Sequence, residues 1–209
     1  MIGIIDYQRS NLFSIARALD YLQVKYRFVK EREDMNGIDH IILPGVGSFT
    51  DAMETLNSTG LSSAIKTAAQ QNKPILGICL GMHLMADYGE EGGKQKGLGL
   101  VSGSVRRLPT QLDTRIPNIG WRAINYQNGI SSFDSIMFYF LHSYVFVPEE
   151  KKAIEATIQF GEYSAPAVIR HKNLMGIQFH PEKSGSDGIK FLAQALSSKP
   201  EKATGAMYG

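Results

Sequence analysis

The motif Gly77-Ile78-Cys79-Leu80-Gly81 places the single cysteine of the chain between two glycines, directly after the apolar residues 74–76. Flanking glycines allow a backbone to turn sharply from strand to helix, which projects the central side chain at the end of a strand. A thiolate at a helix N-terminus is also favoured by the helix dipole. The motif therefore predicts a nucleophile elbow with Cys79 as the reactive group, against the simpler alternative of a buried structural cysteine.

Apolar runs alternate with amphipathic stretches in the first half of the chain. Residues 1–5, 24–29 and 41–43 predict strands, and residues 12–22 and 51–71 have helical spacing, with Gly60 as a break or kink. This order predicts an α/β fold with a mostly parallel central sheet flanked by helices. Ligands bind at the carboxyl ends of such strands, so the elbow and the loop after residues 41–43 are expected at one site.

The second half has shorter, strand-like runs, which predict an added antiparallel β portion. These runs cover residues 98–101, 123–126, 136–140, 144–147, 153–160 and 167–169. A final helix is expected over residues 188–197, and the glycine-rich residues 89–97 are expected to form a solvated loop. Length and composition favour a single domain over residues 1–198, followed by a flexible tail over residues 199–209.

Composition narrows the classes of partner. A net charge of +2 from 22 basic and 20 acidic residues gives no basic footprint for nucleic acid. No apolar run approaches the roughly 20 residues that a membrane span needs. One cysteine and a buried-strand N-terminus without signal-peptide features favour a cytoplasmic protein. The histidines lack the paired spacing of a metal site, so no metal and no other cofactor is expected.

A second motif far downstream supplies a base for the thiol. In Gly176-Ile177-Gln178-Phe179-His180-Pro181-Glu182, an apolar strand ends in a histidine with a carboxylate two residues later. A nucleophilic cysteine needs a base to accept its proton, and a third group to orient that base. Cys79, His180 and Glu182 are therefore predicted to form a catalytic triad.

These two motifs resemble those of the class I, triad-type glutamine amidotransferases, which carry a GxCxG elbow and a later FHPE sequence. The sequence Pro44-Gly45-Val46-Gly47 is similar to the PGVG form of the family's oxyanion loop. Together with residues 179–184, it resembles the glutaminase subunit of imidazole glycerol phosphate synthase. The resemblance covers nearly the whole chain and implies a flavodoxin-like class I amidotransferase fold.

The resemblance also implies roles for individual residues. The oxyanion hole is expected at Gly45, Val46, Gly47 and Leu80. Glutamine is expected to contact Gly47, His83, His142, Ser143 and Tyr144. The partner interface is expected to include Asn11, Trp121, Tyr139 and Lys183, although an isolated Trp or Tyr is more often packed in its own core.

The function implied by the resemblance is hydrolysis of glutamine and delivery of ammonia to a (β/α)8-barrel cyclase subunit, in a heterodimer of histidine biosynthesis. Three departures from the family pattern leave an alternative open. His83 replaces a usual glutamine and Asn118 a usual histidine, and Gln8-Arg9-Ser10 replaces a glycine-containing turn before Asn11. The alternative is a paralogous glutaminase that supplies ammonia to a different barrel enzyme for amidation of a surface-polysaccharide sugar. A cysteine hydrolase of the same fold and a non-catalytic binding module are less favoured, because all three triad positions are filled.

Overall fold

A computed structural model describes residues 1–7, 11–110, 114–127 and 131–197. The tail expected over residues 199–209 lies outside these described residues. The helices are α1 (Leu12–Tyr21), α2 (Phe49–Ser58), α3 (Leu61–Gln70), α4 (Leu80–Leu84) and α5 (Gly185–Ser197), with 3-10 turns at Arg32–Met35, Lys151–Ala153 and Pro181–Lys183. None of the helices in this part of the chain is long and apolar enough to span a membrane.

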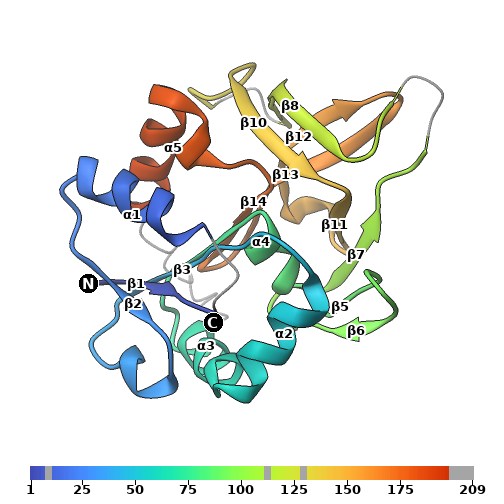
Figure 1. Ribbon diagram of the computed structural model, residues 1–209. Helices are drawn as coiled ribbons and strands as arrows, with labels where there is room; N and C mark the ends of the chain where they lie inside the picture. Colours follow the sequence, from blue (N-terminus) through green and yellow to red (C-terminus); the bar gives the residue numbers. More distant parts are fainter. Residues whose placement is uncertain (8–10, 111–113, 128–130, 198–209) are drawn as a thin grey trace, which may run out of the picture.

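An eight-stranded sheet runs through the molecule (Figure 1). In spatial order its strands are β2 (Tyr26–Val29), β1 (Ile2–Ile5), β3 (His40–Leu43), β4 (Ile75–Ile78), β14 (Leu174–Ile177), β13 (Tyr163–His171), β12 (Ile154–Phe160) and β9 (Asn125–Tyr126). The first five pair in parallel, and β13, β12 and β9 continue the sheet with antiparallel pairing. The predicted α/β fold with a mostly parallel sheet and an antiparallel addition is confirmed.

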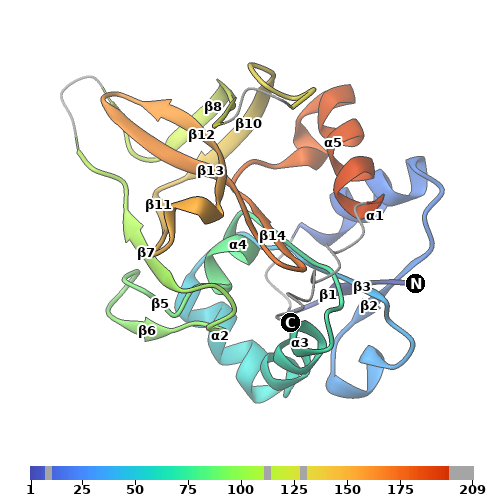
Figure 2. The same ribbon diagram turned by 180° about the vertical axis from the view of Figure 1, so that it is seen from behind.

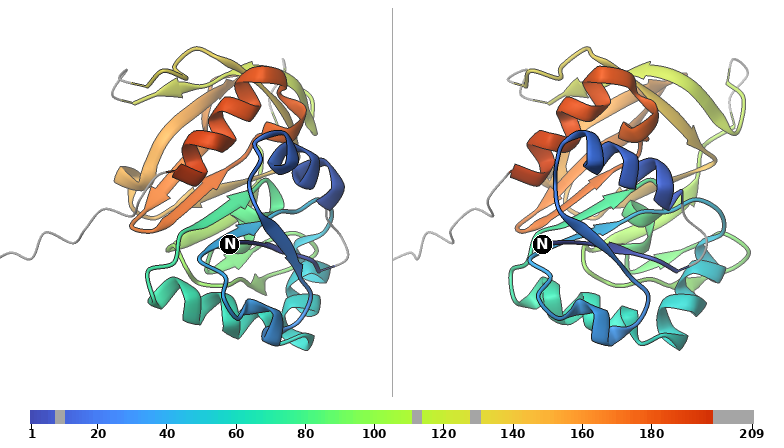
Figure 3. Two further views of the ribbon diagram at one scale, coloured as in Figure 1. Left: turned by 90° about the vertical axis from the view of Figure 1, so that its left-hand side faces the viewer. Right: turned by 60° about the vertical axis from the view of Figure 1, so that its left-hand side comes forward.

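Helices cover both faces of the parallel strands (Figure 3). Successive side chains of a strand point to opposite faces, and here both sets are apolar. Ile4 and Leu76 pack on the face of α1 and α5, whereas Ile5 and Ile75 pack on the face of α2 and α3. Two hydrophobic clusters therefore hold the sheet from both sides.

Two smaller sheets lie beside the large one (Figure 2). A two-stranded ribbon pairs β8 (Asn118–Ala123) with β10 (Met137–His142). A four-stranded sheet contains β11 (Tyr144–Pro148), β7 (Gly103–Arg107), β5 (Tyr88–Gly89) and β6 (Gln95–Lys96). The expected solvated loop over residues 89–97 is confirmed only in part. β5 and β6 form a hairpin there, and residues 90–94 are its mostly exposed connection.

Several predicted boundaries shift for identifiable reasons. The predicted strand over residues 98–101 is absent, because the amides of Leu98 and Leu100 bond to the carbonyls at the end of α4, and the strand β7 begins later. Gly60 adopts φ +72° and separates α2 from α3, as its predicted role as a break requires. The last helix begins at Gly185, three residues before the predicted start.

Gly77 and Gly81 of the elbow do not have a positive φ; they are needed because the backbone packs closely against them. Cys79 itself has φ +52°, a conformation that costs a non-glycine residue about 1–3 kcal/mol. A Cβ on Gly81 would lie 1.7 Å from the carbonyl oxygen of Leu43 in β3, and one on Gly77 would lie 2.7 Å from the carbonyl oxygen of Gly81. The absence of side chains lets α4 press against β3 and β4 and holds the strained Cys79 in place.

We expect Gly81→Ala to destabilise the chain strongly, because the new methyl group would meet backbone that has no room to move. Overpacking of this kind costs about 1–3 kcal/mol, and a backbone clash places it at or beyond the upper value. Urea unfolding followed by circular dichroism measures the loss. Lys66→Ala on the exposed side of α3 is the control and should change the free energy of unfolding by less than about 0.5 kcal/mol. Equal stability of the two variants would contradict the packing role of Gly81.

Candidate active site

Three neighbouring parallel strands bring the predicted motifs together. The strands β3, β4 and β14 lie side by side, so the loop after Leu43, the elbow after Ile78 and the segment after Ile177 emerge at one edge of the sheet. The Cys79 amide extends the ladder by donating to the carbonyl oxygen of Ile177, at 2.8 Å. The juxtaposition therefore follows directly from strand order.

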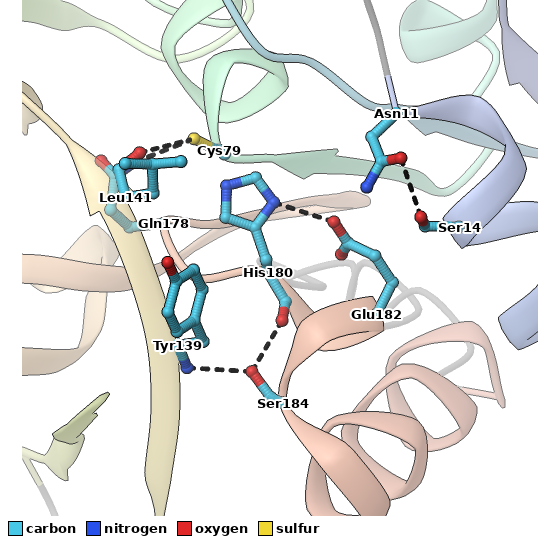
Figure 4. A network of polar contacts seen from close by, with 9 residues as sticks. All are labelled: Asn11, Ser14, Cys79, Tyr139, Leu141, Gln178, His180, Glu182 and Ser184. Carbon is cyan, nitrogen blue, oxygen red and sulfur yellow. Dashed lines mark hydrogen bonds and ion pairs between the residues drawn. The ribbon is translucent and has the colours of Figure 1, made fainter. Parts of the chain in front are cut away.

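The sulfur of Cys79 has two neighbours besides the histidine (Figure 4). Its thiol donates to the carbonyl oxygen of Leu141 in β10, at 3.8 Å. The side-chain amide of Gln178 donates to the sulfur, at 3.7 Å. Cys79 is 6 % exposed, so these contacts lie in a nearly dry environment.

His180 and Glu182 form a buried pair behind the sulfur. The Nδ1 atom of His180 lies 2.9 Å from Oε1 of Glu182, and their side chains are only 2 % and 1 % exposed. Burial by itself lowers the pKa of His180, but the interactions with the Cys79 sulfur and with the Glu182 carboxylate outweigh it and raise the pKa well above its usual value. Nε2 of His180 makes no conventional hydrogen bond and lies on the side of the ring that faces Cys79 (Figure 4). This is the arrangement of a base oriented by a carboxylate.

The backbone of the predicted oxyanion loop packs directly on the elbow. The Leu80 amide donates to the carbonyl oxygen of Gly45, at 3.4 Å. A Cβ on Gly45 would lie 2.8 Å from Cβ of Leu80 and 2.1 Å from the hydroxyl of Tyr7, which itself donates to Pro44. The amide predicted to stabilise an oxyanion is therefore occupied by a carbonyl of the loop in this conformation.

A pocket of about 320 Å³ opens next to Cys79. The predicted residues that line it are Val46, Gly47, Cys79, Leu80, His83, His142, Ser143 and Tyr144. Its other lining residues, Glu91, Pro117 and Leu141, were not identified from the sequence. Glu91 lies in the segment expected to be a solvated loop, yet its carboxylate accepts the Phe49 amide at the start of α2 and faces the pocket. The pocket thus offers a carboxylate to a ligand with an ammonium group.

The other two histidines of the site are held neutral. Burial lowers the pKa of His83 to about 4 and that of His142 to about 3. Nδ1 of His142 donates to the carbonyl oxygen of Tyr144, at 2.8 Å, and Nε2 accepts from Asn118, at 2.9 Å. Nε2 of His83 bonds to Oε1 of Gln178, at 2.7 Å, so this nitrogen is directed at a protein group rather than into the pocket. Asn118, noted in the sequence as a departure, orients His142.

The residues predicted at the partner interface surround the outer side of the site. Trp121 is 50 % exposed on β8 and makes an edge contact with the ring of Tyr139 on β10. Lys183 is exposed after the triad histidine, and Asn11 precedes α1, where its side chain accepts from Ser14. The possibility that Trp121 packs in its own core is wrong, because half of its surface is free.

Comparison with known proteins agrees with this geometry. The family described as "Glutamine amidotransferase class-I" matches residues 3–197. A solved structure described as "Crystal structure of glutamine amidotransferase" has a TM-score of 0.74, with 18 % identity over 93 % of this chain and 96 % of that chain. PurLQS from Thermotoga maritima has a TM-score of 0.71, with 19 % identity over 93 % and 96 % of the two chains. The chain belongs to the class I glutamine amidotransferases, and these solved structures share its fold.

Relatives with higher identity identify the branch of the family. Imidazole glycerol phosphate synthase subunit HisH of Geobacillus thermodenitrificans is 41 % identical over 199 residues, covering 92 % of this chain and 93 % of the relative. The HisH subunit of Oceanobacillus iheyensis is 42 % identical over 196 residues, covering 92 % and 96 %. The chain is therefore a member of the HisH family of imidazole glycerol phosphate synthase subunits.

The buried pair predicts a pH-dependent contribution to stability. The pKa of His180 is raised on folding, so its charge stabilises the fold fully below the unfolded value of about 6.5, and this contribution is lost as the pH rises through the raised pKa. We expect Glu182→Gln to lower the pKa of His180, measured by NMR titration of the imidazole. We also expect it to reduce the free energy of unfolding by about 1.5–3 kcal/mol at pH 6, and by less at pH 10.

Glu150→Gln is the control for this experiment, because Glu150 is paired with Lys152 at the surface. Exposed pairs contribute about 0–1 kcal/mol, so this variant should leave the His180 titration unchanged. An unaltered His180 titration in Glu182→Gln would show that the carboxylate does not set the charge of the imidazole.

Proposed function

We propose that the chain is the glutaminase subunit of an imidazole glycerol phosphate synthase, hydrolysing glutamine with the triad Cys79, His180 and Glu182 and passing ammonia to a cyclase subunit. The observation that carries the proposal is the convergence of Cys79, the buried His180–Glu182 pair and a pocket at three adjacent strand ends. Membership of the HisH family supports the transfer of ammonia to a cyclase subunit. The HisH relatives support histidine biosynthesis over the sugar-amidating alternative. A biosynthetic role of this kind supports a cytoplasmic location as part of the proposal.

In the first half of the reaction, the Cys79 sulfur attacks the side-chain carboxamide carbon of glutamine. The carbonyl double bond opens to give a tetrahedral oxyanion, which backbone amides stabilise where the charge develops. His180, protonated and held by Glu182, gives its proton to the departing nitrogen. Ammonia leaves, and a γ-glutamyl thioester on Cys79 remains.

In the second half, neutral His180 takes a proton from water, which attacks the thioester carbon. The tetrahedral intermediate collapses with cleavage of the carbon–sulfur bond, His180 returns its proton to the sulfur, and glutamate and the free thiol result. Glu182 holds the imidazole in one orientation during both steps, because its carboxylate accepts from Nδ1 and leaves Nε2 for the reacting groups. Glu91 is the counter-ion we assign to the α-ammonium group of glutamine.

The occupied Leu80 amide supports control of this chemistry by a partner. An oxyanion would need the donor that now bonds to Gly45, so the loop must rearrange before the amide becomes available. Loss of one oxyanion donor costs about 100- to 1000-fold in rate. Activity of the isolated chain is therefore expected to be low until a partner changes the loop.

An exposed apolar surface supports the position of the partner. Alternate residues of the β8–β10 ribbon point outward, and this set, the ribbon patch, consists of Ile119, Trp121, Met137, Tyr139 and Leu141. Its inward counterparts Phe138 and Phe140 are fully buried against Phe179. Contiguous exposed apolar side chains mark interaction sites. Leu141 belongs both to the patch and to the pocket, so a cyclase bound there would receive ammonia next to Cys79.

We expect Cys79→Ala to abolish glutamate release from glutamine, with a loss of at least about 1000-fold, because the covalent step has no other nucleophile. The assay mixes the chain with a histidine-pathway cyclase, with and without its ribonucleotide substrate. Wild-type protein should be strongly stimulated by the ribonucleotide. A variant that retained hydrolysis would contradict the covalent mechanism, and a stable wild-type complex that stayed silent would contradict the histidine-pathway assignment.

We expect Trp121→Ala to weaken cyclase binding by roughly 30-fold or more, corresponding to about 2 kcal/mol for the loss of a central interface tryptophan. Isothermal titration calorimetry measures the affinity. Tyr21→Ala is the control, since Tyr21 is a 78 % exposed aromatic at the C-terminal end of α1 and is not part of the ribbon patch. Equal affinities of the two variants would argue against the ribbon patch as the interface.

A further inference from the structure

Gln178 connects two groups of the site without belonging to the triad. It is fully buried and directly precedes the Phe179-His180 pair at the end of β14. Its amide nitrogen lies 3.7 Å from the Cys79 sulfur, and its amide oxygen lies 2.7 Å from Nε2 of His83. Register explains the first contact, because Ile177 pairs with Ile78 and the next residues of both strands are therefore neighbours.

The chemistry of the three groups determines how the amide must be oriented when the sulfur is ionised. A thiolate only accepts hydrogen bonds, so the amide NH₂ group must face it. The amide oxygen is then left facing His83, whose Nε2 must carry the proton of that bond. His83 is buried and its pKa is lowered, so it is neutral and has one N–H to give. His83 and Gln178 thus form a chain of hydrogen bonds that ends in a donor aimed at the sulfur.

We propose that Gln178 is a positioning residue for the nucleophile, and that its amide, held by His83, stabilises the thiolate form of Cys79. The protonated and ionised forms of the sulfur then have different partners. The thiol donates to the carbonyl oxygen of Leu141, whereas the thiolate loses that bond and keeps the one from Gln178. The Gln178 amide consequently favours ionisation of Cys79, because its hydrogen bond to the sulfur is kept when the thiol proton moves to His180.

This assignment also explains why His83 serves the site although its Nε2 does not reach the pocket. The imidazole is in the correct place to prevent the buried amide from turning its oxygen toward the sulfur, where two electron-rich atoms would repel each other. His83 therefore acts on Cys79 through Gln178. The inference rests on the proposed function only in taking Cys79 as the nucleophile.

Alkylation of the single cysteine tests the proposal without glutamine or a partner. The rate of reaction of the full-length chain with iodoacetamide, measured from pH 5 to pH 10, reports the ionised fraction of Cys79 directly. For Gln178→Met, an unbranched side chain of similar size, we expect the pH of half-maximal rate to rise by about one unit. At pH values well below both midpoints the rate should fall about tenfold, because there one pH unit corresponds to a factor of ten in the ionised fraction.

Gln159→Met provides the control, since this glutamine is exposed on β12 and its side-chain amide donates to the nearby carbonyl of Gly161. Its alkylation curve should match that of the wild type. A folded Gln178→Met protein with an unshifted curve would overturn the proposal. Circular dichroism establishes folding. A structural role alone would lower stability without moving this midpoint.

His83→Leu keeps the proposal open to refutation if Gln178→Met does not fold. Leu removes the bond that orients the amide and leaves Gln178 in place, so the alkylation curve should shift in the same direction by a smaller amount. An unchanged curve in folded His83→Leu would overturn the role of His83. Failure of glutamine hydrolysis in wild-type protein would instead contradict the proposed function and leave the alkylation result intact.

Discussion

The contact between Gly81 and the backbone of β3 determines where the reactive sulfur lies. Because no side chain separates α4 from the carbonyl of Leu43, the helix begins immediately at the end of β4. Cys79 must then adopt a positive φ to join strand to helix. The hydrogen bond from its backbone amide to the carbonyl oxygen of Ile177 in β14 holds it there. Apolar packing on both faces of the sheet keeps the backbone of Cys79 in this strained conformation.

The histidines around the sulfur are all buried, yet their pKa values shift in opposite directions. His83 and His142 have no carboxylate partner among the described residues, so desolvation keeps them neutral. His180 is equally inaccessible but lies against Glu182 and the sulfur, and its pKa rises. Three imidazoles close together would repel one another if all were charged, and desolvation removes that cost for two of them. The site therefore concentrates one positive charge where proton transfer is proposed.

Sequence reasoning predicted the features that depend on local pattern and missed those that depend on packing between distant segments. The alternating apolar runs predicted the parallel sheet, and strand-end positions predicted that residues 45–47, Cys79 and His180 would meet. Glu91 was missed because a glycine-rich loop gives no sign of which way a carboxylate faces. The role of Gln178 could not be predicted from the sequence, because its bond to His83 joins residues that are 95 positions apart. The close approach at Gly81 was interpreted as conformational freedom, since a sequence does not show what a missing Cβ would touch.

In the proposed mechanism, the bond between the Leu80 amide and the Gly45 carbonyl separates the resting from the active geometry. A backbone hydrogen bond contributes about 0.5–1.5 kcal/mol net, and one of 3.4 Å belongs at the weak end of that range. Coupling energies between distant sites are about 1–3 kcal/mol, so a partner can supply enough to break this bond and free the amide. Gly45 cannot carry a side chain, because Tyr7 and Leu80 occupy the space. The loop is therefore packed tightly enough to block the donor at rest, yet held by a bond weak enough for partner binding to release.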